Sequence, residues 1–457
     1  MQAELQDSGG HKNGRWGMKR AIALMVLVSG AVASTWPMAS VMARSATADR
    51  RILPLPATDF KGEIAPAVAA STPSFPQRIT APEKAPNVIL IMTDDVGFGV
   101  ASTFGGPVPT PNLDRLAARG LVYNRFHTTA LCSPSRAALL TGRNQHNVGT
   151  GVVTDLATGY PGYTSIIPKS AATIAEVLRQ NGYSTSMFGK HHNVPMWEET
   201  AAGPFDHWPT GLGFEYFYGF IGGATNQWHP TLVRGTNHVT VPDTGSEDAI
   251  LDRFLADDAI RWLHEQNAAA PDKPFFMYYA PGTAHSPHQA PRRWIESFRG
   301  KFDRGWDVLR AETVERQKAR KLIPAATEVT LRPEGIPAWD TLPMESKQVA
   351  ARMMEVYAGM IAFQDAQIGR ILDEIARMGQ ADNTLVIFVE GDNGASPEGG
   401  LEGSTNSGAT IIDRQSEDAA WRYSQLDVLG SEKTLGHFPV GWTWALNAPL
   451  PWMKGVA

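Results

Sequence analysis

Four short runs of apolar residues punctuate the chain, and each has the length of a β-strand. The run at residues 87–93 is continuously apolar rather than alternating, and that at 274–280 is of the same type, which is typical of strands in a parallel sheet that is covered on both faces. The four runs are residues 87–93, 183–188, 274–280 and 384–391.

Amphipathic segments lie between these runs. Residues 247–266 place apolar side chains roughly on one face, and residues 346–379 predict one long helix or two. Shorter helices are predicted at 110–119 and 173–181, each followed by a glycine. The alternation predicts an α/β fold, with a mostly parallel sheet and helices on both faces. Residues 298–345 are charged, irregular and interrupted by prolines, and they predict a surface excursion.

Polar side chains follow every one of the four predicted strands. In an open parallel sheet the carboxyl ends of the strands lie along one edge, where ligands bind. Taken singly, each group has an ordinary explanation as a turn or a solvated histidine. Together they predict a ligand site. The side chains are Asp94 and Asp95, Lys190 and His192, His285, and Asp392 with Asn393.

The single cysteine, Cys132, precedes a predicted helix that starts at Pro134 and stops at Gly142. The N-terminus of a helix favours an anion, and Arg136 adds a guanidinium one turn along. A lone cysteine is more often a buried and inert residue. The residues around this one favour an oxyanion site.

Composition limits the possible partners. The chain has 457 residues, of which 43% are hydrophobic and 19% charged, enough for a large globular core. The net charge is −5 and the basic residues are dispersed, so we expect no nucleic-acid partner.

The first 43 residues combine a basic start, a short apolar run and small residues, which indicates a signal peptide and export to the periplasm or the medium. We then expect no stable membrane association after cleavage, although an uncleaved anchor is the alternative. Residues 44–84 are rich in Ala, Pro, Ser and Thr and predict a linker. Residues 85–457 would form the catalytic domain.

The motif C-x-P-S-R at Cys132–Arg136, followed by L-T-G-R at 140–143, resembles the signature of the type I sulfatases. The resemblance runs from about Asn87 to the end and is strongest to the large bacterial arylsulfatases. It implies an alkaline-phosphatase-like fold and hydrolysis of a small-molecule sulfate ester. It also implies that a formylglycine-generating enzyme converts Cys132 to formylglycine, whose hydrated aldehyde attacks sulfur and later expels sulfate.

The resemblance also implies a divalent-cation site. The family's strand-end D-D matches Asp94 and Asp95, and its D-N-G matches Asp392 and Asn393. Three carboxylates and an amide oxygen are hard donors, which suit one Ca²⁺ or Mg²⁺ per chain rather than zinc. The cation would polarise the sulfate and favour a deprotonated nucleophile, assisted by Arg136.

The remaining family motifs assign basic residues to the sulfate. G-K-x-H matches residues 189–192, so that Lys190 would bind sulfate and His192 would act as the base for sulfate release. H-x-P-H-x-A-P matches residues 285–291, so that His285 would also bind sulfate. Lys454 is the best match for the lysine that helps His285 to protonate the leaving alcohol. His191 would be a bystander.

The chain stops three residues after Lys454, whereas the family continues with further strands and a smaller C-terminal domain. We therefore expect that domain to be missing, Lys454 to lie on a frayed tail, and the chain to be poorly soluble or weakly active. A phosphonate or phosphate monoester hydrolase of the same superfamily is an alternative function. An inactive truncated remnant is another.

Overall fold

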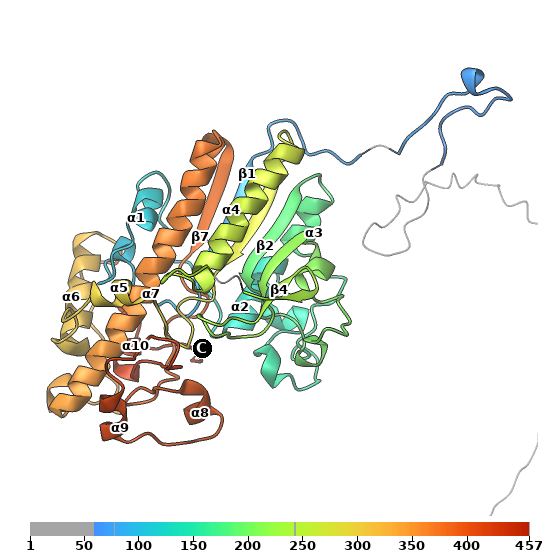
Figure 1. The fold of residues 1–457 in the computed structure, drawn as a ribbon. Coiled ribbons are helices and arrows are strands. Elements are labelled where there is room, and N and C mark those ends of the chain that lie inside the picture. Colours follow the sequence, from blue (N-terminus) through green and yellow to red (C-terminus); the bar gives the residue numbers. More distant parts are fainter. Residues whose placement is uncertain (1–58, 77, 242–243, 457) are drawn as a thin grey trace, which may run out of the picture. The chain divides into compact units, whose positions relative to one another are not determined.

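The computed structural model describes residues 59–76, 78–241 and 244–456 (Figure 1). The predicted signal peptide and the first part of the predicted linker, up to residue 58, lie outside the described residues. The rest of the linker is mostly exposed and contains one 3-10 turn, Val68–Ala70. Within the described ranges, no helix combines the length and the apolar content that a membrane span requires.

One mixed sheet organises the described chain. Its strand order is β5-β4-β3-β2-β6-β1-β7. The five strands from β3 to β7 in this order are parallel, and β4 and β5 extend the sheet as an antiparallel pair. The strands are β1 (Asn87–Met92), β2 (Ser184–Lys190), β3 (Tyr216–Phe220), β4 (Leu232–Arg234), β5 (Asn237–Val239), β6 (Phe275–Ala280) and β7 (Thr384–Val389).

The four strands predicted from apolar runs are β1, β2, β6 and β7, and they are neighbours in the parallel part. The α-helices of the described chain are α1 (Pro111–Ala117), α2 (Cys132–Thr141), α3 (Ile174–Arg179), α4 (Leu251–Ala269), α5 (Arg292–Glu296), α6 (Gly305–Ala319), α7 (Met344–Arg377), α8 (Ser407–Ile411), α9 (Ala419–Ser424) and α10 (Val440–Leu446). Residues 346–379, predicted as one helix or two, belong mainly to the single helix α7.

Both faces of the sheet are buried at the central strands β1, β2 and β6, whereas alternate residues of the edge strand β7 are exposed. Alternate residues of β1 point to opposite faces. Ile89 and Ile91 pack with side chains of α4 and α7, which cross the sheet in Figure 1, and Leu90 and Met92 pack with side chains of α2 and α3. The α/β class with helices on both faces is therefore confirmed.

The prediction of a surface excursion over residues 298–345 is wrong for its first half. The segment contains α6, whose Trp306 is buried and meets Trp339 and Trp442 in edge-to-face contacts, with ring centroids 4.8 and 5.6 Å apart. Arg310 of α6 is fully buried and donates to the main-chain oxygens of Trp444, Pro449 and Leu450. The charged residues along α6 hide this role, because most of the partners of Trp306 and Arg310 lie more than a hundred residues away in the sequence.

Candidate active site

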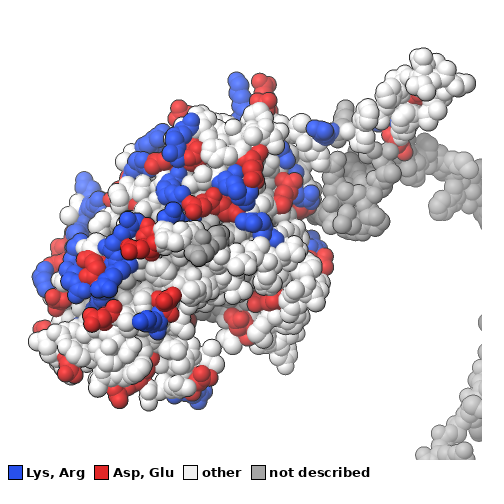
Figure 2. All heavy atoms as spheres, viewed as in Figure 1, with Lys and Arg blue, Asp and Glu red and all other residues white. Residues whose placement is uncertain are grey.

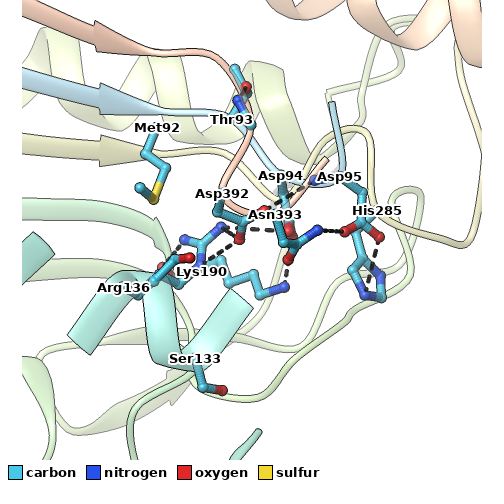
Figure 3. A network of polar contacts seen from close by, with 12 residues as sticks. Met92, Thr93, Asp94, Asp95, Ser133, Arg136, Lys190, His285, Asp392 and Asn393 are labelled. Carbon is cyan, nitrogen blue, oxygen red and sulfur yellow. Dashed lines mark hydrogen bonds and ion pairs between the residues drawn. The ribbon is translucent and has the colours of Figure 1, made fainter. Parts of the chain in front are cut away.

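The polar residues at the strand ends meet in one buried cluster (Figure 3). Asp94 and Asp95 follow β1, Lys190 ends β2, His285 follows β6, and Asp392 with Asn393 follow β7. The backbone N–H of Asp95 donates to Asp392 Oδ1 at 3.3 Å, and Asn393 Nδ2 donates to Asp95 Oδ1 at 2.7 Å. The parallel sheet thus brings together residues almost 300 positions apart.

Cys132 is the first residue of α2, so it lies at a helix N-terminus as predicted, although the helix begins two residues before the predicted start at Pro134. Leu131 precedes the helix with extended backbone, and Gly142 ends it with a φ of 64°. Cys132 is 2% exposed. Burial raises the pKa of its thiol, and nearby Lys190 and Lys454 only partly oppose this effect. The unmodified side chain is therefore a neutral thiol near pH 7 rather than a thiolate nucleophile.

Two basic side chains, Arg136 and Lys190, pair with the carboxylates of the cluster. Arg136 donates from Nε and Nη2 to Asp392 Oδ2 at 3.1 and 2.9 Å, and Lys190 Nζ lies 2.7 Å from Asp94 Oδ2. All four side chains are fully buried. Burial opposes ionisation of Asp94, yet Lys190 and Arg136 hold its pKa below the ordinary value. The pKa of Asp392 is raised by burial and by Asp94.

The donor set fits a divalent cation. Asp94, Cys132 and Asp392 each offer one ligand atom, and these atoms lie within 4.8 Å of one another. Asp94 Oδ1 and Asn393 Oδ1 are buried and accept no hydrogen bond in the described structure. Buried acceptors without a donor are costly unless something else satisfies them. Oxygen ligands of this kind suit Ca²⁺ or Mg²⁺.

His192 lies at the side of the cluster formed by β2. Its Nε2 is 3.3 Å from Asp155 Oδ2, while its Nδ1 is buried without a partner. Burial lowers the pKa of His192, and Asp155 offsets the effect only in part, so the ring is neutral near pH 7. Since the carboxylate accepts from Nε2, the lone pair is on Nδ1. A Cβ at Gly223 would lie 2.8 Å from the ring, so this glycine allows the close approach.

The expectation of a frayed Lys454 is wrong. Its side chain is 6% exposed, its backbone N–H donates to Ala395 O at 3.1 Å, and the next residue, Gly455, donates to Ala130 O at 2.9 Å. Lys454 Nζ lies 2.9 Å from Asp95 Oδ2 and 3.2 Å from His285 Nε2. Lys454 therefore joins the site, held by the loops after β7 and before α2.

Two carboxylates at the site are not marked by any sequence pattern. Asp155 lies in a loop between α2 and α3, and Glu398 follows the Asp392-Asn393 pair by a few residues, with Oε1 3.2 Å from Lys454 Nζ. The closeness of Glu398 to Asp392 and Asn393 in the sequence is the only signal that could have pointed to it.

His191, expected to be a bystander, is fully buried, and burial lowers its pKa to about 3.

A protein-family model described as Sulfatase matches residues 86–425. The chain is 31% identical over 398 residues to an uncharacterised sulfatase of Schizosaccharomyces pombe, covering 82% of this chain and 68% of that protein. It is 33% identical over 330 residues to an arylsulfatase of Klebsiella aerogenes, covering 70% of this chain and 68% of that protein.

Solved structures also align with this chain. A putative sulfatase from Bacteroides fragilis aligns with a TM-score of 0.49 and 20% identity, covering 69% of this chain and 63% of that one. The described chain thus corresponds to about two thirds of the length of the proteins that it matches.

Proposed function

The chain belongs to the sulfatase family of sulfuric ester hydrolases, and on this premise we propose that it hydrolyses sulfate monoesters of the arylsulfatase type. The nucleophile would be a formylglycine made from Cys132, and one Ca²⁺ or Mg²⁺ would be bound. The observation that carries the proposal is the position of Cys132 at the start of α2, with its Sγ within 4.8 Å of carboxylate oxygens of Asp94 and Asp392.

The cation would be held by Asp94, Asp95, Asp392 and Asn393, where it would polarise the sulfate and favour a deprotonated nucleophile. Arg136 supports the same end, because its guanidinium is fixed between Asp392 and the main-chain oxygen of Lys190. A fixed positive charge in a site without water stabilises an attacking oxyanion more than it would in solution.

The histidines and lysines would divide the proton transfers. His192 presents an unprotonated, unpartnered Nδ1, which suits the base that takes a proton when sulfate is released. On the other side, Lys454 and His285 share a hydrogen bond at 3.2 Å and would protonate the leaving alcohol. Lys190 and His285 would bind sulfate oxygens.

The test is expression with a formylglycine-generating enzyme, followed by mass spectrometry and an assay. The tryptic peptide that contains residue 132 should be lighter by about 18 Da than the cysteine form. The matured protein should hydrolyse 4-nitrocatechol sulfate, and a Cys132→Ala variant should not.

Parallel assays on a phenylphosphonate ester and a phosphate monoester separate the alternatives. Faster turnover of either would assign the site to phosphoryl chemistry instead. Complete maturation without turnover of any ester would favour an inactive remnant, and an unmodified thiol after co-expression would remove the proposed nucleophile.

We also propose export, with residues 1–43 as a signal peptide. The basic and apolar pattern of this segment supports the proposal. N-terminal sequencing of protein recovered from the periplasm or the medium tests it, since cleavage should fall within the small residues near position 43. An uncleaved N-terminus in the membrane fraction would favour the anchor.

A further inference from the structure

Lys454 is surrounded by three acceptors. Its Nζ lies 2.9 Å from Asp95 Oδ2, 3.2 Å from His285 Nε2 and 3.2 Å from Glu398 Oε1. An ammonium has three N–H donors and no acceptor. The three contacts therefore use every donor of Lys454 and fix where its ammonium lies.

The tautomer of His285 follows from its other contact. His285 Nδ1 lies 2.9 Å from the main-chain oxygen of Ser286. Because a carbonyl oxygen can only accept, Nδ1 carries the proton and Nε2 accepts from Lys454. Lys454 is thus the proton donor of the pair. Its position beside His285 decides whether the pair can protonate the leaving alcohol.

Asp95 alone cannot hold Lys454 in this position in the loaded enzyme. Asp95 is a proposed ligand of the divalent cation, and a bound cation shares its negative charge. The cation also repels an ammonium through Coulomb's law. A second anion in contact with Lys454, and not itself a proposed ligand of the cation, would keep the ammonium beside His285.

Glu398 has this place. It lies in the loop after β7, and its candidate ligand atom groups with those of Asp95 and His285 rather than with those of Asp94 and Asp392. Its Oε1 lies 3.2 Å from Lys454 Nζ, so that the two side chains form an ion pair.

We propose that Glu398 is a positioning residue that holds the Lys454 ammonium beside His285 Nε2 once a divalent cation is bound at Asp95. The inference rests on the proposed function, because it gives Lys454 the role of protonating the leaving alcohol. Its consequence is a dependence on the leaving group: Glu398 matters for alkyl sulfates, whose alkoxides need a proton, and matters little for nitrophenyl sulfates.

The kinetic test is Glu398→Gln, which keeps the size and one acceptor but removes the charge. We expect kcat to fall about tenfold or more for an alkyl sulfate, within the range of a general acid, and less than about threefold for 4-nitrophenyl sulfate. Equal losses on both substrates would overturn the proposal. The matched control is Glu402→Gln on the same loop, whose carboxylate pairs with Arg422 and is 64% exposed; it should change neither value.

A double-mutant cycle checks that Glu398 acts through Lys454. If it does, Glu398→Gln added to Lys454→Met should cost nothing beyond Lys454→Met alone. Additive losses would show an independent role and overturn the proposal.

Crystal structures and metal analysis supply a readout that needs no activity. In calcium-loaded Glu398→Gln the Lys454 ammonium should leave His285 Nε2, while calcium per chain stays as in the unaltered protein. An unmoved Lys454, or a loss of calcium that would make Glu398 a ligand, contradicts the inference. If the unaltered protein hydrolyses no sulfate ester, the proposed function fails, and the crystal structures still decide whether Glu398 positions Lys454.

Discussion

At the residue scale, Asp94 is a buried carboxylate whose two oxygens have different surroundings. One of its oxygens is paired with Lys190, and the other is buried without a hydrogen bond and 3.5 Å from Arg136. A cation or a substrate bound beside this oxygen would supply the partner that it lacks. Its neighbour Asp95 has a positive φ of 52°, a backbone conformation that aspartate tolerates better than most residues.

We predict that Asp94→Asn lowers the bound divalent cation per chain and reduces turnover by more than about a hundredfold, as loss of a main electrostatic group does. Elemental analysis after dialysis against calcium measures the first effect. The matched control is Asp373→Asn, a surface carboxylate paired with Arg115 and 54% exposed. Equal calcium in both variants would show that the cation site is misplaced.

A second residue-scale prediction concerns Asp252, which is 3% exposed in the first turn of α4. Burial raises its pKa to about 7, from 3.8. The folded protein therefore keeps a proton that the unfolded chain releases between about pH 4 and pH 7, so the stability contributed by this group is lost as the pH rises through that window.

Asp252→Asn removes this titration. We expect the Tm of the variant to change less between pH 4 and pH 8 than that of the unaltered protein, with a gain of about 2 °C or more at pH 8. Thermal unfolding followed by circular dichroism measures both curves. Parallel curves for the two proteins would mean that Asp252 does not carry the effect.

At the element scale, two glycines with positive φ position the site in different ways. Gly189 in β2 has a φ of 104°, and a Cβ there would lie 2.0 Å from Ala280 O on the paired strand β6. Gly142 ends α2 with a φ of 64°, and a Cβ there would meet nothing within 4 Å. The first glycine is required by contact and conformation, and the second by conformation alone.

We therefore predict that Gly142→Ala costs about 1 kcal/mol and leaves activity intact, since only the left-handed conformation is strained. Gly189→Ala should cost more than about 3 kcal/mol or prevent folding, because it separates β2 from β6 and displaces Lys190. Urea unfolding of both variants gives the comparison. Similar urea midpoints for the two variants would show that the sheet accommodates a Cβ at position 189.

At the scale of the whole molecule, the charged side chains are mixed in sign on one face (Figure 2), whereas exposed apolar side chains lie on the edge strand β7. On the face shown in Figure 2, Lys and Arg lie among Asp and Glu without a large region of one sign. The absence of a nucleic-acid partner stays a prediction from the net charge and the dispersed basic residues. In contrast, β7 is the last strand of the described sheet, and its Leu385 and Ile387 are 50% and 42% exposed.

An apolar edge strand pairs readily with other chains. We predict that the described region associates at high concentration and that Leu385→Lys reduces this association without changing the Tm. Sedimentation velocity over a concentration series measures it. Leu331→Lys is the matched control, because Leu331 is 92% exposed but lies outside the strands. Equal effects of both substitutions would exclude β7 as the contact.

The sequence alone determined the parallel core and most of the site. Strands β1 and β6 are continuous apolar runs because both of their faces are buried, and β1, β2, β6 and β7 all place polar residues at the shared carboxyl edge. Cys132 lies at a helix N-terminus because Pro134 and Gly142 act within a few residues of it. These signals are local, so they can be read without the fold.

Only the tertiary structure decided the remaining features. Strands β3, β4 and β5 extend the sheet beyond β2. Helix α6 is buried because Trp306 and Arg310 contact residues of α10 and of the segment after it. Lys454 is ordered by Asp95, His285 and Glu398, and no pattern around position 454 reports these contacts. Burial and pairing between distant residues depend on the path of the whole chain, and that path is fixed only by the packed fold.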